Sequence, residues 1–530
     1  MPYDVIIRNG TLYDGSGGEP VTGDVAIEGD TIAALGDLGG ATASVELDVH
    51  GLAVTPGFIN MLSWANVSLI HDGRSQSDIR QGVTLEVLGE NFSMGPLNEA
   101  MKAQMLEDQG DIPYAVEWTT LGEYLDYLVQ RGVSCNVTSF VGSESVRIHE
   151  LGYENRRPTP DELDRMRALV RQAMEEGAVG LSSALIYAPA CYADTDELVA
   201  LAEVVAEYDG LYISHLRSEG DQVFEALDEF FTILRRAGVR GEIYHLKLSG
   251  KQNWGKYDEF IRRIEAARAE GLPVTADMYT YPASSTGLDA SIPGWAHEGG
   301  HKALVARLKD PATRARILDE MTRFKEIDAA GDTLLVGFKN DALKPLQGKT
   351  LQAVADMRGK SAPETVLDLI VEDDSRVQAV FFSMSEDNVR RQMALPWVSF
   401  DSDAGSYSAE GLFLKRSTHP RAYGTFARVL GKYVRDEGVV PLADAVRRLT
   451  SLPASVLKIN RRGLLTPGYY ADVVVFDPAT VQDHATYHHP HQYATGVHHV
   501  FVNGVHVLKD GDHTGATPGR VVRGPGWRQE

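Results

Sequence analysis

The chain has 530 residues, 43% of them hydrophobic, and its 51 basic and 74 acidic side chains give a formal net charge of −23. The length and apolar content predict a large domain plus a smaller one, and the acidity argues against nucleic acid or an anionic membrane as a partner. Two cysteines, Cys135 and Cys191, stand far apart and predict no disulfide framework. With no signal-peptide pattern and no membrane-length apolar run, the expected location is the cytoplasm.

Both ends of the chain are predicted to form short strands joined by turns. An apolar run precedes the Asn-Gly pair at residues 9–10, which is typical of a hairpin, and Gly-Asp at 29–30 separates two further runs. Near the other end, the Asn-Gly pair at 503–504 lies between two apolar segments in the same way. We therefore expect residues 1–58 and 459–530 to form one small β-sandwich domain.

The middle of the chain alternates short apolar runs with longer helical stretches. The predicted strands are 84–88, 179–181, 211–213, 242–244, 274–276 and 397–400, and the predicted helices include 162–176, 197–208, 222–237 and 257–270. This alternation is typical of a parallel sheet whose strands are linked by helices. Its repetition predicts an α/β fold with a TIM-like (β/α)8 barrel over residues 59–458.

Residues 289–345 interrupt the alternation. They contain Pro-Gly-Trp at 293–295 and then a charged helical run over 303–324. We interpret this segment as an insertion over the barrel mouth, in the position of a lid.

Polar side chains follow several predicted strands, where a barrel places its chemistry. His215 and His245 each follow such a strand, about one strand–helix unit apart, so both can reach one pocket. One such histidine alone is more often a hydrogen-bonded core or surface residue, but two at matching strand ends favour a zinc-type metal site. Glu90 follows the run 84–88 and either completes a set of two histidines and a carboxylate or forms a salt bridge.

Two acidic residues follow the last predicted strand of the middle region. Asp401 and Asp403 lie in Asp-Ser-Asp-Ala-Gly, a composition that also suits an ordinary turn. Because the preceding strand is apolar, we interpret one of them as a metal ligand or as the general base for a metal-activated water.

Two further groups are candidates for substrate binding. Residues 279–286 crowd hydroxyl groups after a predicted strand, which suits a polar substrate or an ordinary serine-rich loop. Arg421 follows the Asp403 loop, and an arginine beside the site of so acidic a chain suggests a fork for a carboxylate. The commoner role of an arginine is a surface salt bridge.

Several short motifs are distinctive when taken together. They are Pro56-Gly57-Phe58-Ile59, Gln81-Gly82-Val83-Thr84, residues 177–183, Ser214-His215-Leu216-Arg217, His245-Leu246-Lys247, Tyr279-Thr280-Tyr281, His419-Pro420-Arg421, and the tail segments 465–472, 513–515 and 518–520. In these motifs the chain resembles the D-aminoacylase (N-acyl-D-amino-acid deacylase) branch of the amidohydrolase superfamily over nearly its full length. The resemblance implies a TIM-like barrel, a β-sandwich and a mouth insertion.

The resemblance also implies a metal site. The family holds its tightly bound metal with two histidines and a cysteine, and His215 and His245 match the histidines. The cysteine position falls in Gly89-Glu90-Asn91, where the chain has no cysteine. We take Glu90 as the substitute ligand, with Asn91 as the alternative.

The catalytic and substrate-binding positions follow from the same resemblance. Ser402-Asp403-Ala404 matches the stretch that carries the family's catalytic aspartate, which favours Asp403 over Asp401. The positions that hold the substrate are matched by Lys247, Tyr281, Ser285 and Arg421, with Arg421 near the substrate carboxylate.

The chain also departs from the family pattern at a set of metal ligands. The two places of the His-x-His pair after Pro-Gly-Phe-Ile hold Leu62 and Trp64, and a further family histidine is Ser143. Together with the missing cysteine, these changes remove a second metal site and alter the first. They leave chemistry that needs one ion, one water and one base.

The sequence therefore predicts a hydrolase that cleaves the amide bond of N-acyl-D-amino acids or similar small amides that carry a carboxylate. One divalent ion, expected to be zinc, activates water, and Asp403 is the general acid and base. The alternatives are a peptidase for dipeptides with a D-residue, a hydrolase of another linear or cyclic amide, or a metal-free binding protein on the same fold. The acyl group, the stereochemical preference and the oligomeric state are not fixed by the sequence.

Overall fold

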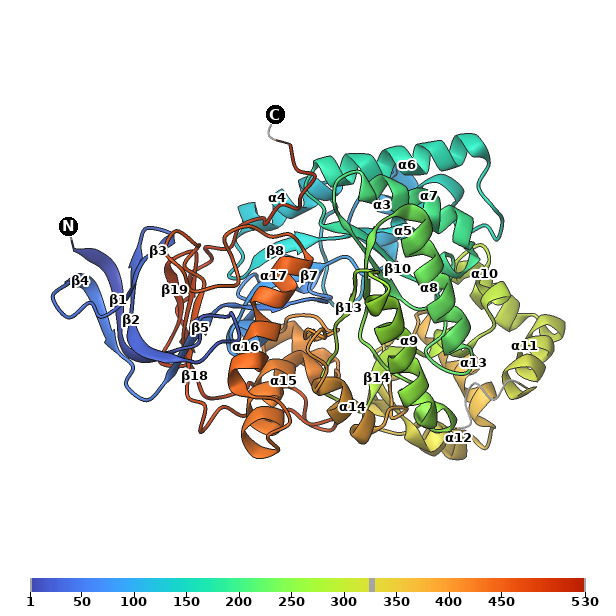
Figure 1. Cartoon of the computed structure of the whole chain (residues 1–530). Coiled ribbons are helices and arrows are strands. Elements are labelled where there is room, and N and C mark those ends of the chain that lie inside the picture. Colours follow the sequence, from blue (N-terminus) through green and yellow to red (C-terminus); the bar gives the residue numbers. More distant parts are fainter. Residues whose placement is uncertain (1, 324–328, 529–530) are drawn as a thin grey trace.

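The computed structural model describes residues 2–323 and 329–528. Within these ranges the two chain ends share one nine-stranded sheet, visible as the blue and red strands on the left of Figure 1. Its strands are β1 (Tyr3–Leu12), β2 (Val21–Glu28), β3 (Thr31–Gly36), β4 (Ala43–Asp48) and β5 (Ala53–Pro56), with β17 (Val473–Phe476), β18 (Val497–Val502), β19 (Val505–Lys509) and β20 (Asp512–His513). The antiparallel pair of β5 and β17 joins the two ends. The predicted union of the two ends is confirmed, and the two layers of a sandwich stay a prediction.

The hairpin predicted at Asn9-Gly10 is wrong. Strand β1 runs through this pair, and its pairing with β2 shifts register between Ile7 and Gly10. Asn9 has a φ of 60°, and a Cβ on Gly10 would lie 2.4 Å from a methyl carbon of Val54. The left-handed Asn9 therefore forms a bulge inside a strand, and a tight turn would need a left-handed residue as well. The other predicted turns, at 29–30 and 503–504, are confirmed.

A set of parallel strands surrounds the functional site. The strands are β6 (Phe58–Asn60), β7 (Val83–Leu88), β8 (Asn136–Ser139), β9 (Val141–Gly142), β10 (Gly180–Ala184), β11 (Leu211–His215), β12 (Arg240–Ile243) and β13 (Val274–Ala276). β6, β7 and β8 pair in order, as do β9 to β13. The predicted parallel strands linked by helices are thus confirmed.

The two sets of strands meet at both edges. On one edge β9 continues β8, and Val179 N donates to Ser139 O at 3.0 Å. On the other edge residues 397–401 lie between β13 and β6: Ser399 N donates to Ala276 O at 2.8 Å, and Phe400 O accepts from the backbone N–H of residue 61 at 3.3 Å. The predicted strand at 397–400 is present as this ladder with a single parallel bridge. We call the closed arrangement the strand ring, and the C-terminal ends of its strands the ring mouth.

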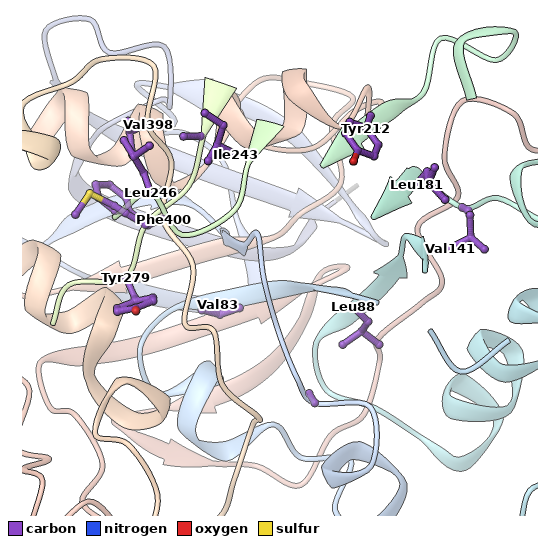
Figure 2. Close-up of a cluster of buried hydrophobic side chains, with 14 of the residues drawn as sticks. Val83, Leu88, Val141, Leu181, Tyr212, Ile243, Leu246, Tyr279, Val398 and Phe400 are labelled. Atoms are coloured by element: carbon purple, nitrogen blue, oxygen red, sulfur yellow. The ribbon is translucent and has the colours of Figure 1, made fainter. Parts of the chain in front are cut away.

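Apolar side chains fill both faces of the strand ring in alternation. Inside it, Ile59, Leu85, Val87 and Ile213 belong to one buried cluster. The outward-facing neighbours belong to a larger cluster against the helices, and Figure 2 shows several of them, among them Tyr212 of β11 and Ile243 of β12. Side chains of a strand point alternately to its two faces, so each strand contributes to both clusters.

Helices cover the outside of the strand ring, as α6, α7, α8 and α9 do in Figure 1. The helices outside the insertion are α1 (Ser68–His71), α2 (Gln76–Ile79), α3 (Glu99–Glu107), α4 (Leu121–Arg131), α5 (Ser143–Leu151), α6 (Pro160–Glu175), α7 (Thr195–Ala206), α8 (Val223–Ala237), α9 (Tyr257–Ala269), α14 (Glu386–Met393), α15 (Arg421–Arg428), α16 (Leu442–Leu449) and α17 (Ser451–Val456). Their starts follow local rules: Thr159 and Glu162 form a capping box at α6, with Pro160 in the first turn. No described helix is long and apolar enough to cross a membrane.

The segment after β13 leaves the ring mouth and builds its own small unit. It contains the antiparallel strands β14 (Ser284–Gly287), β15 (Thr333–Gly337) and β16 (Gln378–Phe381) and the helices α10 (His301–Lys309), α11 (Pro311–Arg323), α12 (Leu351–Arg358) and α13 (Ala362–Asp373). A separate apolar cluster holds them together from Leu288 to Ala379. The boundaries 289–345 stay a prediction.

The single helical run predicted over 303–324 is wrong. It is divided into α10 and α11 at Asp310, whose ψ of 119° is extended. Pro311 causes the break, because proline disfavours a helical residue before it and is tolerated as the first residue of a helix. Residue 324 lies outside the described residues.

Candidate metal centre

Glu90, His215 and His245 come together at the ring mouth. Glu90 follows β7, His215 ends β11 and His245 follows β12, and one ligand atom from each lies within 4.8 Å of the others. Glu90 Oε1 is 3.5 Å from His215 Nδ1 and 3.2 Å from His245 Nε2. All three are buried, with at most 5% of each exposed. Two imidazoles and a carboxylate are the donor set of many catalytic zinc sites.

Asn91, the alternative to Glu90, has other partners. Its side-chain oxygen accepts from the backbone of Ala184 at 2.8 Å, and its amide donates to Glu144. The structure therefore groups Glu90, and not Asn91, with the two histidines.

The backbone is strained at three points around the ring mouth. Asn91, His245 and Asp403 have φ angles of 58°, 35° and 44°. Non-glycine residues avoid this left-handed region at a cost of about 1–3 kcal/mol, and such strain persists where the surrounding structure enforces it. Two of the three, His245 and Asp403, are candidate site residues, and Asn91 directly follows the candidate ligand Glu90.

Glu219 is a member of the site that the sequence reasoning did not assign. Its carboxylate lies 3.4 Å from His215 Nε2 and 3.1 Å from His245 Nδ1, the nitrogens that face away from Glu90. It is also 2.8 Å from Lys247 Nζ. One carboxylate thus contacts both imidazoles on their far side, as the outer partners of metal-bound histidines do. The only sequence signal was a glutamate four residues after His215.

The two carboxylates and the two rings shift each other's protonation. Burial opposes charge on Glu90 and Glu219, but the two histidines, with Lys247 in the case of Glu219, hold both pKa values below the ordinary range. Burial lowers the pKa of His215, whereas Glu219 and Glu90 outweigh burial and Lys247 and raise the pKa of His245 to about 10. Glu90 and Glu219 thus favour the protonated, cationic form of the His245 ring that lies between them. A divalent ion would fit beside Glu90 once this ring lost its proton.

Asp403 faces the centre from the neighbouring side of the ring mouth. Its Oδ1 accepts from the indole nitrogen of Trp64 at 3.2 Å, and its Oδ2 lies 2.7 Å from Arg421 Nη1. Asp401 is fully buried, and burial followed by the charge of Asp403 raises its pKa to about 7. Asp403 is therefore the more accessible of the two carboxyl groups and the one with cationic and N–H partners.

The predicted substrate-binding residues separate into two groups. Lys247 and Arg421 both approach the ring of Tyr279, at 5.6 and 4.5 Å from its centroid, and this ring is 6.4 Å from that of His245. Arg421 also donates from Nη2 to the backbone oxygen of Ser285 at 3.4 Å, while its buried Nε has no hydrogen-bond partner among the described residues.

The hydroxyl groups of the other two predicted residues point elsewhere. Tyr281 donates to Asp483 at 3.3 Å and packs against His419, and Ser285 donates to the backbone of Ala379 at 2.9 Å. Among the described contacts none joins Tyr281 to the Glu90 group, and the aromatic residue at the centre is Tyr279. The strand β13 ends before both tyrosines, so alternation along a strand could not distinguish them.

Comparisons with known proteins give relatives that match nearly the whole chain. Residues 143–508 match the model of the amidohydrolase family. A D-aminoacylase from Alcaligenes xylosoxydans xylosoxydans is 35% identical, covering 98% of both chains. The structure of an N-acyl-D-glutamate deacylase from Bordetella bronchiseptica, with zinc and a phosphonate that mimics the tetrahedral intermediate, superposes with a TM-score of 0.82 at 30% identity, covering 99% of this chain and 100% of that one. A D-aminoacylase structure described for one-metal activation and second-metal attenuation of its binuclear centre gives 0.83 at 35% identity, covering 98% and 100%.

Proposed function

This chain belongs to the D-aminoacylase (N-acyl-D-amino-acid deacylase) group of the amidohydrolase family, and on that premise we propose that it hydrolyses N-acyl-D-amino acids to a carboxylic acid and a free D-amino acid. The observation that carries the proposal is the buried cluster of Glu90, His215 and His245, with Asp403 on the adjacent side of the same ring mouth.

The proposal includes the architecture that supports this site. The strand ring and its helices form a TIM-like (β/α)8 barrel over residues 59–458, and residues 1–58 with 459–530 form a β-sandwich domain. Residues 289–345 belong to an insertion that leaves the ring at its mouth. Barrel enzymes place their chemistry on loops at this end of the strands.

One divalent ion, zinc, would be held by Glu90, His215 and His245, with the Glu219 carboxylate 3.4 and 3.1 Å from the outer nitrogens of the two imidazoles. When bound, such an ion polarises the scissile carbonyl and acidifies a water molecule. Glu219 keeps both rings in one orientation, and Lys247 balances the charge of that second carboxylate.

Asp403 moves the proton. Its carboxylate takes a proton from the attacking water and delivers it to the amide nitrogen as the C–N bond breaks. Trp64 and Arg421 hold one oxygen each, so the carboxylate keeps one orientation during both transfers.

Arg421 and Lys247 orient the substrate. The N–H of Arg421 Nε, which has no hydrogen-bond partner among the described residues, is the donor for the substrate carboxylate. Lys247 matches a substrate position of the family and approaches the same tyrosine ring from the histidine side, where its Nζ pairs with Glu219. Tyr281 and Ser285, which match substrate positions of the family, contribute the wall of the pocket beside Tyr279 and Arg421.

A paired hydrolysis screen tests the proposal. N-acyl-D- and N-acyl-L-amino acids with the same acyl group, together with dipeptides that contain a D-residue and cyclic amides, are incubated with the chain, with and without added zinc. We expect zinc-dependent cleavage of the D-series, with the L-series as the matched control. Preferred cleavage of a dipeptide or a cyclic amide would assign the chain a different amide substrate. A chain that binds no zinc and cleaves no substrate would be better explained as a binding protein.

A further inference from the structure

The loop after β6 and the Asp403 loop are fixed to each other by their backbones. Asp403 N donates to Leu62 O at 3.0 Å, and Trp64 N donates to Ala404 O at 2.9 Å. Ser63 and Ala404 form a parallel bridge. Because these main-chain bonds hold the two loops in register, the side chains of residues 62 and 64 have defined positions relative to Asp403.

Trp64 uses this position to hold the carboxylate of Asp403. Its indole nitrogen donates to Oδ1 at 3.2 Å, while Arg421 Nη1 lies 2.7 Å from Oδ2. Each oxygen therefore has one partner and keeps one lone pair. An indole N–H is a donor only, so residue 64 offers no electron pair to a cation.

Leu62, whose backbone oxygen accepts from Asp403 N, carries an apolar side chain. It is fully buried and packs in the inner cluster of the strand ring with Ile59, Met61, Leu85 and Val87. A cation at this point would lose its water without gaining a ligand from residue 62, which is strongly unfavourable. Among the described residues the only group of His, Cys, Asp and Glu side chains arranged for a metal is Glu90, His215 and His245.

We propose that Trp64 is a positioning residue for Asp403 and that Trp64 and Leu62 together exclude a second metal ion, so that excess metal does not attenuate this chain. The inference rests on the proposed function and specifies the regulation of the same site. A D-aminoacylase of the same family has a binuclear centre in which the second metal attenuates activity. In this chain the β6 side has the apolar Leu62 and the N–H donor Trp64 in place of metal ligands. The indole N–H of Trp64 holds the carboxylate of Asp403.

The first test is metal stoichiometry. The wild-type chain is equilibrated with zinc buffered from nanomolar to millimolar, and bound zinc is counted by elemental analysis beside hydrolysis of the best N-acyl-D-amino acid. Leu62→His/Trp64→His supplies two possible ligands, and His215→Ala in the otherwise wild-type chain identifies the ions that bind outside the strand ring. For the wild type we expect one zinc ion inside the strand ring and an activity that stays constant at high zinc. For the double variant we expect a second zinc ion inside the strand ring and an activity that falls as zinc rises.

The second test isolates the indole N–H. Trp64→Phe keeps an aromatic ring and removes the donor, and Trp527→Phe, at an exposed tryptophan outside the strand ring, is the matched control. Because hydrogen bonds to charged groups contribute about 1.5–3 kcal/mol, we expect kcat to fall by roughly tenfold or more at unchanged KM and unchanged zinc content. If Trp64→Phe acted only through lost packing, the fall in kcat would be accompanied by a change in zinc content or in thermal stability.

The outcomes separate the two claims. Any one of three results overturns this inference and leaves the proposed function intact. They are a second zinc ion inside the strand ring of an active wild-type chain, attenuation of that chain by excess zinc, and an unchanged kcat in Trp64→Phe. A wild-type chain that binds no ring zinc and cleaves no substrate overturns the proposed function, and this inference with it.

Discussion

The two sides of the ring mouth are built from opposite kinds of side chain. The histidine side, made by Glu90, His215, Glu219, His245 and Lys247, is buried and densely charged. The β6 side, made by Leu62, Trp64 and Asp403, has an apolar residue and an indole in place of ligands. On the proposed function, the cation lies on the histidine side only and the β6 side positions the base. Metal binding and proton transfer would then be divided between two neighbouring sets of strands.

The largest effect on bound zinc and on turnover is expected from the removal of a ligand on the histidine side. His245→Ala takes one donor from the cluster, and we expect bound zinc to be lost and turnover to fall by at least about four orders of magnitude, because the water is no longer activated. His499→Ala, at a buried histidine in the nine-stranded sheet, is the control and should retain both. A zinc-loaded, active His245→Ala chain would contradict the division of roles.

The next largest effect is expected on the β6 side. Asp403→Asn keeps the shape of the side chain and removes its capacity to accept a proton, so turnover should fall by roughly 10²–10⁴-fold. Zinc content should stay at the wild-type value, which elemental analysis of the same sample checks. Turnover near the wild-type value would show that another group is the base.

A smaller effect, on zinc affinity, is expected from Glu219, which faces the histidine nitrogens that point away from Glu90. Glu219→Gln retains the size of the side chain and removes the charge that both outer imidazole nitrogens face, so zinc affinity should fall by about 10–100-fold. Glu229→Gln, in helix α8, is matched in burial and removes a carboxylate that pairs with Arg217, so it should leave zinc affinity unchanged. Competition with a chelator measures both, and equal affinities in the two variants would contradict the role of Glu219.

The smallest expected effect concerns stability on the β6 side. Glu86 is buried beneath Ser63, and burial followed by the charge of Asp78 raises its pKa to about 8. A carboxyl whose pKa is raised on folding binds more protons in the folded chain, so its contribution to the unfolding free energy is present at low pH and lost as pH rises towards 8.

Glu86→Gln should therefore lose less stability than the wild type between pH 6 and pH 8, by up to about 1.4 kcal/mol per pH unit. Denaturant midpoints at the two pH values measure this difference. Parallel losses in the two proteins would show that Glu86 is already ionised at pH 6.

Sequence reasoning located the histidine side better than its surroundings. Glu90, His215 and His245 were predictable because each follows an apolar run, and parallel strands carry their C-terminal ends to one edge. Glu219 was not, because it lies in a loop whose return to the histidines is set by tertiary packing.

The errors in the fold have equally local causes. Asn9-Gly10 is the residue pair typical of a hairpin turn, yet the strand continues through it, because a left-handed Asn9 serves a bulge as well as a turn. Pro311 divides a helical run that is otherwise continuous in composition. The union of the two chain ends in one sheet was predictable because both carry short apolar strands and neither carries a strand–helix repeat.

Zinc-edge anomalous diffraction from crystals soaked in excess zinc tests the comparison most directly. The account predicts one strong peak inside the strand ring, between Glu90, His215 and His245, and no peak beside Leu62, Trp64 and Asp403. A second peak on the β6 side, or no peak among the three ligands, would contradict it.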